Sequence, residues 1–279
     1  MAPFEDLSVA QANVLFYREI AAKYDEYESC TSDPGMQSML NADLDRIAGL
    51  FGSRQKPVAC LDCGGGSGNL SLKMLTRGWS VTVVDVSPEM LALLEAKAAR
   101  AGFAPRLING DVSAFLEDSR EQYDLVTFNS VLHHLHSYLP VVESAARHVA
   151  PHGVFYSNFD PVPSKRPALT KIFETFDTLA GKLAHDRSDL LPGALRRIKK
   201  QFRKRDEQHG RPVVSPGDLA EYHAKTGVDD LAIIALLKTN GFSLLEHSRW
   251  PTGRTAPTKA INKRLRMLES FKVIAQLGG

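Results

Sequence analysis

A regular alternation of short apolar segments with helical segments between residues 58 and 159 constrains the fold more than any other feature. The apolar segments are rich in Val, Ile, Leu and Phe, which is typical of buried strands. The expected strands are residues 58–62, 80–85, 106–109, 123–128 and 154–159. Strands and helices that alternate over this length predict a parallel sheet with helices on both faces.

Local helix signals agree with this alternation. Ser87 precedes Pro88 and Glu89, which supplies an N-cap, a proline at the first helical position and an acid in the first turn. We expect this helix to stop at Gly102, because glycine commonly follows the last helical turn.

Acidic and amide side chains stand where the expected strands end. The carboxyl ends of parallel strands meet at one edge of the sheet, and ligands bind beyond that edge. The residues at the strand ends are Asp62, Asp85, Asp111, Asn129 and Asp160. The sequence therefore predicts a ligand site at this edge.

A glycine-rich loop follows the first strand and runs from Asp62 to Gly68. Its alternate glycines let the backbone turn sharply and approach a ligand without a Cβ between them. The dinucleotide pattern G-x-G-x-x-G would need a third glycine at the position of Asn69. An acid also precedes the loop, where it would repel a pyrophosphate, so NAD-dependent hydride transfer is the weaker interpretation.

Several motifs in this order resemble the class I S-adenosylmethionine (SAM)-dependent methyltransferases, of the type that acts on small molecules. The Asp-x-Gly-x-Gly-x-Gly segment at residues 62–68 resembles motif I of that family, and Asp85 resembles the acid that closes its second strand. Gly-Asp-Val at residues 110–112 and the segment 123–135 are similar to its third-strand and fourth-strand motifs. Ile-Ala-Ala-Lys-Tyr-Asp at residues 20–25 resembles a segment that precedes the domain.

The resemblance covers residues 11–160 and, more weakly, residues 229–277. It implies a Rossmann-like α/β fold with a seven-stranded, mostly parallel sheet, N-terminal helices and a helical lid insertion. It also implies SAM as the cofactor, with Asp85 on the ribose hydroxyls and Asp111 beside the adenine. The implied cofactor-binding residues are Tyr17, Tyr24, Asp62, Gly64, Gly66, Gly68, Asp85, Val86, Met90, Asp111, Val112 and Asn129.

Charge supports this interpretation independently of the resemblance. SAM carries a sulfonium and an ammonium, and the Asp62 carboxylate is placed to offset that positive end. Plainer roles also fit these residues: Asp85 as a turn residue, Asp111 as a helix N-cap and Asn129 as a strand cap. Tyr24 fits a core aromatic equally well.

Methyl transfer from a sulfonium needs alignment and, where the acceptor loses a proton, a base. The catalytic candidates are His133, His134 and His223, since His titrates near neutral pH. His136 and Asp160 are further candidates. In the family the His-His pair also serves a structural role, which leaves open whether a base is used. No group of side chains has metal-ligand spacing, and no metal is expected.

The pattern divides the chain into four predicted segments. These are an N-terminal helical cap (1–55), the SAM-binding core (56–160), a basic helical lid (161–228) and a C-terminal part of the core sheet (229–279). The cap carries expected helices at residues 11–28 and 36–52, and the last segment carries strands at residues 242–247 and 271–277.

Basic charge is concentrated in the expected lid. Residues 163–211 contain 13 Lys and Arg against 6 Asp and Glu, although the whole chain has a net charge of only +2. The run at residues 196–205 fits a solvated helix, or a lid that attracts an acidic small molecule, a carrier-bound substrate or RNA.

Bulk properties exclude several other classes. A hydrophobic content of 43% is that of a globular protein, and three cysteines do not form a disulfide framework. No apolar run reaches the ~18 residues of a membrane span, and the acidic start is unlike a signal peptide. We therefore expect a soluble, cytoplasmic protein without membrane insertion.

The sequence thus predicts an enzyme, a SAM-dependent methyltransferase that acts on oxygen or nitrogen of a small molecule in secondary metabolism. Two alternatives stay open: a methyltransferase for RNA or another polyanion, and a SAM-binding protein with a non-methylating or interaction role. Nucleic acid is the less favoured partner, because the net charge does not require one.

Overall fold

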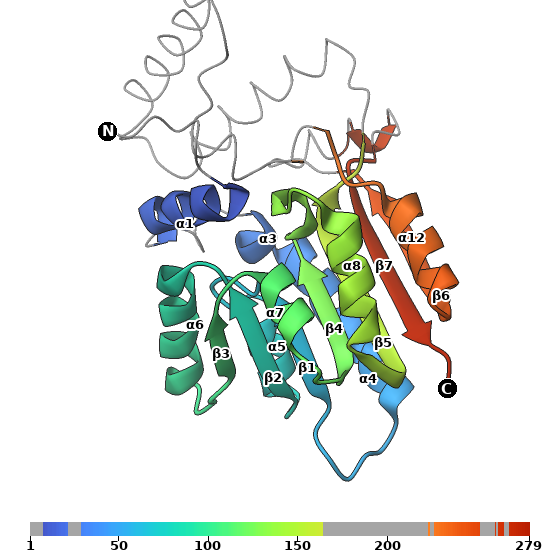
Figure 1. The fold of residues 1–279 in the computed structure, drawn as a ribbon, viewed down its shortest axis with the longest axis horizontal. Helices are drawn as coiled ribbons and strands as arrows, with labels where there is room; N and C mark the ends of the chain where they lie inside the picture. The colour runs from blue at the N-terminus through green and yellow to red at the C-terminus, as the bar shows by residue number, and fades with distance from the viewer. Residues whose placement is uncertain are drawn as a thin grey trace, which may run out of the picture.

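The computed structural model describes residues 8–21, 29–163, 223, 226–251, 260, 262–264 and 268–279. Its centre is a seven-stranded sheet with the strand order β3-β2-β1-β4-β5-β7-β6 (Figure 1). The first five strands in sequence are parallel to one another, whereas β7 runs antiparallel to both β5 and β6. The predicted Rossmann-like, mostly parallel sheet of seven strands is confirmed.

All seven expected strands are present. They are β1 (Ala59–Cys63), β2 (Ser80–Asp85), β3 (Arg106–Asn109), β4 (Tyr123–Asn129), β5 (Val149–Pro161), β6 (Phe242–Trp250) and β7 (Ser270–Leu277). Strand β5 begins earlier than expected because Val149 already pairs with Tyr123, and β6 continues to Trp250 because it still pairs there with Ser270.

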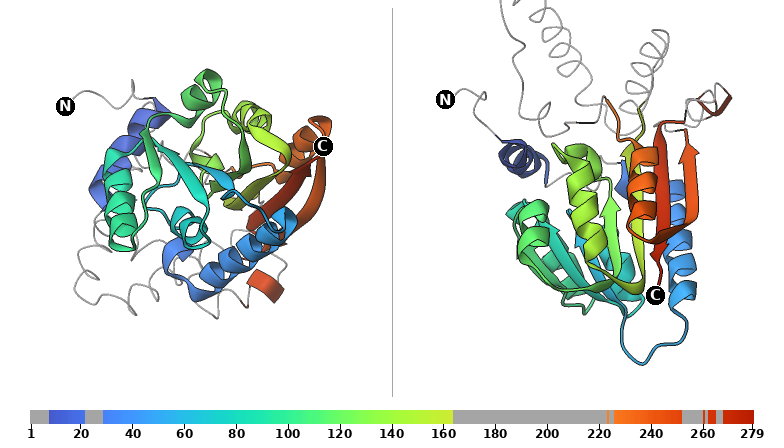
Figure 2. Two further views of the ribbon diagram at one scale, coloured as in Figure 1. Left: turned by 90° about the horizontal axis from the view of Figure 1, so that it is seen from below. Right: turned by 45° about the vertical axis from the view of Figure 1, so that its right-hand side comes forward.

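Helices cover both faces of this sheet (Figure 2). One hydrophobic core lies under α7 (Val112–Asp118), α8 (Tyr138–Arg147) and α12 (Asp230–Thr239). A second core lies under α4 (Pro34–Phe51), α5 (Ser71–Thr76) and α6 (Pro88–Arg100). Other described helices include α1 (Val9–Ile20), α3 (Ser29–Ser32) and the 3-10 turn η3 (Leu132–His134). Because helices cover both faces of the sheet, a ligand can bind only at its edge, beyond the carboxyl ends of the strands.

Helix α1 lies across the end of the sheet at which the parallel strands finish (Figures 1 and 2). A capping box fixes its start, since the Ser8 hydroxyl accepts from the Gln11 backbone and the Gln11 side chain accepts from the Ser8 backbone. An ion pair of 2.8 Å between Arg18 and Glu89 ties α1 to α6. The sequence placed this helix from residue 11 to about 28, so its true start was missed.

Several sequence predictions fall outside the described residues. They concern Tyr24, the second part of the first expected helix and most of the basic lid at residues 161–228. The division of the chain into four segments therefore stays a prediction. Within the described ranges, no helix is long and apolar enough to cross a bilayer.

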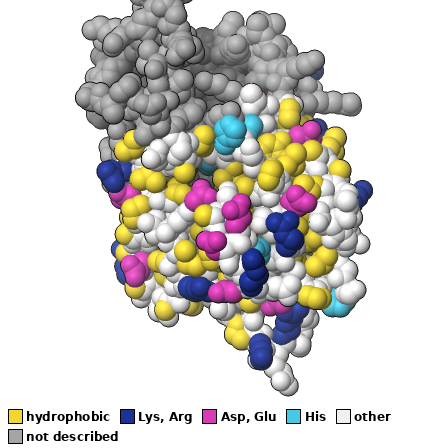
Figure 3. Space-filling model, in the orientation of Figure 1, with side chains coloured by type: hydrophobic (Ala, Val, Ile, Leu, Met, Phe, Trp, Pro, Cys, Tyr) yellow, Lys and Arg dark blue, Asp and Glu magenta, His cyan; other side chains and the backbone are white. Residues whose placement is uncertain are grey.

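Side chains on the face that carries α7 and α8 are distributed unevenly (Figure 3). Acidic and basic side chains are intermixed over its middle and lower parts. Histidine side chains are visible at its upper end, where the parallel strands finish, and also in its middle and at its lower right.

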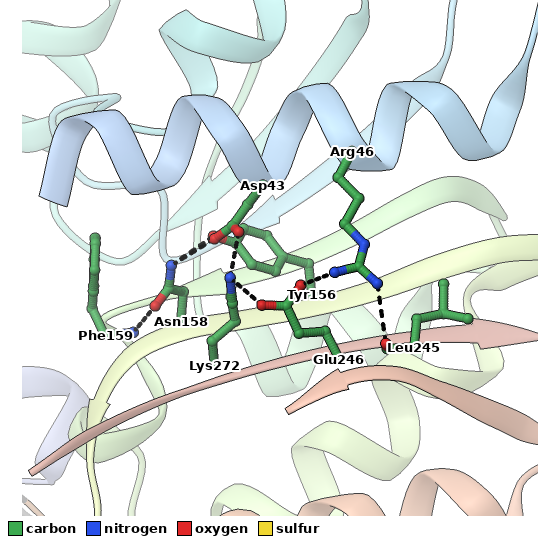
Figure 4. A network of polar contacts seen from close by, with 8 residues as sticks. All are labelled: Asp43, Arg46, Tyr156, Asn158, Phe159, Leu245, Glu246 and Lys272. Carbon is green, nitrogen blue, oxygen red and sulfur yellow. Dashed lines mark hydrogen bonds and ion pairs between the residues drawn. The ribbon is translucent and has the colours of Figure 1, made fainter. Parts of the chain in front are cut away.

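A buried polar network fixes α4 to the other face of the sheet (Figure 4). The Lys272 ammonium lies 2.5 Å from an Asp43 carboxylate oxygen and 2.6 Å from the Glu246 carboxylate. The Tyr156 hydroxyl donates to the other Asp43 oxygen at 2.9 Å, and the Asn158 amide donates to the Tyr156 hydroxyl at 2.6 Å. Burial raises the pKa of Asp43, and the bond from Lys272 opposes that rise. The network joins α4 to β5, β6 and β7.

We expect Lys272→Met to destabilise the protein by about 3–5 kcal/mol, because it leaves the Asp43 carboxylate buried without its counter-ion. The side chains of Lys272 and Asp43 are only 8% and 5% exposed. Urea unfolding at pH 7 measures the effect. Arg106→Ala is the control, since its pair with Glu121 is about half exposed and is worth roughly 0–1 kcal/mol. Equal losses in the two variants would contradict a dominant role for the network.

Candidate functional site

A cavity of about 710 Å³ lies between α1 and the carboxyl ends of the parallel strands. It is lined by the glycine loop after β1, the ends of β2 and β4, the start of α7 and one side of α1. The sequence-predicted residues that line it are Tyr17, Gly64, Gly66, Asp85, Val86, Met90, Asp111, Val112, Asn129, His134 and His136. The fold thus brings together residues that are more than 100 positions apart in the chain.

The glycine loop has the backbone that only glycine adopts readily. Gly64 and Gly66 have positive φ angles of 69° and 53°. A Cβ on Gly64 would lie 2.7 Å from a methyl group of Val131, so no larger residue fits there. Gly68 also has a positive φ, but a Cβ there would meet Leu94 of α6 at 2.2 Å. Gly64 and Gly66 therefore shape the cavity, whereas Gly68 allows α6 to pack.

Asp85 joins the glycine loop to the end of β2. Its Oδ2 accepts from the Gly66 backbone N–H at 2.8 Å, and its Oδ1 accepts from the Ser87 backbone N–H at 2.9 Å. Burial raises the pKa of this carboxyl, although both backbone bonds favour its charged form. Each oxygen keeps a further lone pair, so the group can accept two more donors from a molecule in the cavity.

Asp111 combines two of the roles considered from the sequence. It is the N-cap of α7, where its Oδ1 accepts from the backbone N–H groups of Ser113 and Ala114 at 2.8 and 3.1 Å. It also lines the cavity. A single carboxylate therefore caps the helix and faces the space beyond β3.

Asp62 does not line the cavity but lies behind the glycine loop, where it is 1% exposed. Its two oxygens accept from the hydroxyls of Ser71 and Thr127 at 2.5 and 2.8 Å. Burial raises its pKa to about 6, against the effect of both hydroxyl bonds. This position differs from the direct contact with a ligand that the sequence suggested, because the loop backbone lies in between.

Two amide oxygens in the cavity wall are buried without a hydrogen-bond partner among the described residues. They belong to Asn129 at the end of β4 and Asn13 of α1. The Asn13 amide nitrogen donates to the carbonyl oxygens of Val9 and His134, which fixes the orientation of that amide. A buried acceptor without a donor is unfavourable, and a donor on a ligand would relieve it.

Of the predicted histidines, His136 and His134 line the cavity, and His134 is the one that contacts α1. Its Nε2 lies 2.9 Å from the Tyr17 hydroxyl, and the two rings meet edge to face at a centroid distance of 5.7 Å. The pair joins α1 to the η3 turn. It places a neutral proton donor and a potential base at the same point of the cavity wall.

The other two predicted histidines do not line the cavity. His133 is buried, and its Nδ1 lies 2.7 Å from an Asp160 oxygen. Burial lowers the pKa of His133 to about 4. The His223 ring lies between the His136 carbonyl oxygen at 3.2 Å and the Thr226 hydroxyl at 3.1 Å, so both ring nitrogens have partners in the protein.

Sequence reasoning missed Asn13 and the adjoining residues of α1 that close the cavity. A signal was available, because Asn13 is a polar side chain between the apolar residues Ala12 and Val14 of an amphipathic helix. It could not be interpreted without knowing where α1 docks. Within the described residues, no group of three or more His, Cys, Asp or Glu side chains could hold a metal ion.

The comparison with known families finds one match for the part of the chain that forms this site. The profile of a family described as a methyltransferase domain matches residues 60–153. These residues are therefore similar to a methyltransferase domain. The matched residues run from β1 to β5 and contain the glycine loop, Asp85, Asp111, Asn129 and His134.

Curated relatives match the methyltransferase domain in sequence. Ubiquinone biosynthesis O-methyltransferase of Vibrio cholerae is 35% identical over 122 residues, which are 43% of this chain and 48% of that protein. The protein of the same name from Aliivibrio fischeri is 32% identical over 122 residues, covering 43% and 50% of the two chains. The match spans about half the length of these relatives.

Solved structures match over nearly the whole chain. Magnesium protoporphyrin IX methyltransferase from Synechocystis, crystallised with SAM, has a TM-score of 0.59 at 13% identity and covers 98% of this chain and 99% of its own. N-methyltransferase NodS from Bradyrhizobium japonicum, in complex with S-adenosylhomocysteine, has a TM-score of 0.57 at 12% identity and covers 96% and 100%. At these identities the likeness shows that the fold is shared.

We expect the stability of the wild type to fall relative to Asp62→Asn as the pH rises from 4 to 7. The pKa of Asp62 is about 6 in the folded protein and about 4 when unfolded, so the folded state binds the proton more tightly. The stabilisation is present below pH 4 and is lost as the pH passes 6. Two pKa units correspond to about 3 kcal/mol.

Urea unfolding of both proteins at pH 4 and pH 7 tests this expectation. The wild-type free energy of unfolding minus that of Asp62→Asn should decrease by up to about 3 kcal/mol between the two pH values. A constant or increasing difference would contradict the assignment of a raised pKa to Asp62.

Proposed function

We propose that this chain binds SAM in the cavity and transfers its methyl group to oxygen or nitrogen of a small molecule. One observation carries the proposal: the glycine loop, two strand-end carboxylates and an unpartnered amide oxygen line the same cavity as the Tyr17–His134 pair. The loop, the carboxylates and the amide oxygen would bind the adenosyl sulfonium of SAM. The Tyr17–His134 pair would face an acceptor that loses a proton.

The adenosyl end would lie along β1, β2 and β3. Asp85 would accept hydrogen bonds from the ribose hydroxyls, since both of its oxygens are already oriented by backbone N–H groups. Asp111 and Val112 line the next part of the cavity and would contact the adenine. Gly64 and Gly66 would let the backbone approach the cofactor closely, because a Cβ at Gly64 has no room.

The amino-acid end would lie between the glycine loop and Asn129. The buried Asn129 Oδ1 would accept from the ammonium group, which supplies the donor that this oxygen lacks. Asp62 would act through the loop rather than by direct contact, because the loop backbone separates it from the cavity. When bound, SAM supplies a methyl group on a positively charged sulfur.

The Tyr17–His134 pair would receive the proton of the acceptor. As the acceptor oxygen or nitrogen forms its bond to the methyl carbon, its own hydrogen passes to this pair, and the carbon–sulfur bond breaks with its electrons going to the sulfonium. His134 is the better base, since imidazole titrates near neutral pH and phenol does not. His133 and His223 are less suited, because neither lines the cavity.

The relatives suggest the class of acceptor. The curated relatives are named as O-methyltransferases of ubiquinone biosynthesis, which supports a hydroxylated small molecule as substrate. A place in secondary metabolism, an acidic or carrier-bound acceptor and a cytoplasmic location are narrower proposals. The acidic or carrier-bound acceptor draws on the basic composition of residues 163–211.

Asp85→Ala should weaken the binding of S-adenosylhomocysteine by about 1–3 kcal/mol, roughly 5-fold to 150-fold in Kd, because it removes a charged acceptor for the ribose. Isothermal titration calorimetry measures the affinity. Asp45→Ala is the matched control, since that carboxylate is 70% exposed on α4 and outside the cavity. An unchanged affinity in Asp85→Ala would remove Asp85 from the cofactor site.

Methyl-labelled SAM, incubated with the protein and a fractionated cell extract, tests the function itself. We expect label in the small-molecule fraction and a rate about 100-fold or more lower for His134→Gln, the usual scale for loss of a base. His152→Gln, at an exposed histidine outside the cavity, should leave the rate unchanged. Label in RNA would favour the polyanion alternative. Binding of SAM without transfer to any fraction would favour a non-methylating role.

A further inference from the structure

A β-bulge near the end of β5 turns Asp160 toward the η3 turn, on the α8 side of the sheet. Asn158 pairs with Lys272 of β7, and Asp160 pairs with the next residue, Phe271, so that Phe159 is an extra residue in the strand. The backbone of Phe159 has a φ of 65°, in the left-handed region that residues other than glycine rarely adopt. Bulges of this kind re-aim a side chain and are frequent beside active sites.

The bulge places the Asp160 side chain on the side of the sheet opposite to that of Asn158. Tyr156 and Asn158 point to the α4 side, where they belong to the Asp43 network (Figure 4). Simple alternation would put residue 160 on that same side. Phe159 takes that side instead, with its ring 5.8 Å from that of Trp250, and Asp160 emerges opposite, toward η3.

The Asp160 carboxyl binds the η3 turn through His133. Its Oδ1 accepts from the backbone N–H of His133 at 3.0 Å and lies 2.7 Å from Nδ1 of the same residue. Asp160 has no exposed surface, and its Oδ2 has no hydrogen-bond partner within the described part of the chain. One buried carboxyl therefore orients both the backbone and the ring of His133.

The His133 ring lies against the ring of His134, with a centroid distance of 3.9 Å. His134 in turn faces the cavity and contacts Tyr17. A continuous series of contacts thus leads from the bulge to the cavity wall, and Asp160 stands at its buried end.

We propose that Asp160 is a positioning residue for His134: it holds the η3 turn through His133 and places a buried negative charge behind the imidazole that faces the cavity. The proposal deepens the proposed function, because it rests on His134 as the base. The carboxylate would stabilise the imidazolium that forms when His134 takes a proton from the acceptor. Asp160 itself touches neither the cavity nor a bound molecule.

The titration of Asp160 agrees with this arrangement. Burial raises its pKa to about 7, and the backbone N–H of His133 and the charge of His134 both lower it. A carboxylate and a nearby imidazolium stabilise each other's charged forms. The other titratable groups around them are Tyr17 from α1, His133 and His136 from the η3 region, and His223.

Asp160→Asn tests the proposal, because it keeps the size of the side chain and removes its charge. NMR spectra of protein with labelled histidine follow each imidazole against pH, and His134→Gln identifies the resonance of His134. We expect the midpoint of the His134 titration to fall by about one pH unit in Asp160→Asn, the lower end of the usual effect of a nearby charge.

Asp43→Asn is the matched control, since Asp43 is also a buried carboxyl but lies on the opposite face of the sheet. It should lower stability without moving the His134 midpoint. An equal shift in both variants, or no shift in Asp160→Asn, would overturn the proposal and leave Asp160 with a structural role alone.

A second measurement stands even if Asp160→Asn does not fold. By reciprocity, loss of the imidazolium in His134→Gln should raise the midpoint of the Asp160 carboxyl, which carboxyl-labelled aspartate reports. An unmoved carboxyl would equally overturn the proposal. Both measurements are independent of methyl transfer, so a failure here is distinct from a failure to bind S-adenosylhomocysteine.

Discussion

The Asp85 carboxylate holds the cavity together, because it ties the glycine loop after β1 to the turn after β2. Its two oxygens bind the backbone N–H groups of Gly66 and Ser87. These bonds fix the loop in a conformation that depends on the positive φ angles of Gly64 and Gly66. The carboxylate also lines the cavity. One side chain therefore builds the site and is available to a ligand.

The two faces of the sheet serve different purposes at its carboxyl edge. On the α4 side, Asp43, Tyr156 and Lys272 form a buried network that fixes the helix to three strands. On the α8 side, Asp160 supports the turn that carries His134. The bulge at Phe159 separates these roles, because it turns neighbouring polar residues of β5 to opposite sides.

The strands, their parallel direction and many of the residues that line the cavity could be predicted from the sequence, since they depend on local patterns. Alternating apolar strands, Ser87 at an N-cap and the spaced glycines each act over a few residues. The burial of Asp62 and the first residue of α1 could not be predicted from local patterns. In the sequence, Asp62 ends an expected strand just as Asp85 does. Only the structure shows Ser71 and Thr127 packed around Asp62, behind the loop. The direction of the Asp160 side chain depends on a β-bulge. The structure shows that bulge through the left-handed φ of Phe159, and no residue pattern in the sequence predicted it.

A crystal structure with S-adenosylhomocysteine tests the central claim most directly. The account predicts ribose hydroxyls about 3 Å from the Asp85 carboxylate and a donor from the ligand on the Asn129 amide oxygen, with the sulfur facing the Tyr17–His134 pair. A ligand bound elsewhere, or bound in this cavity with its ribose away from Asp85, would contradict it.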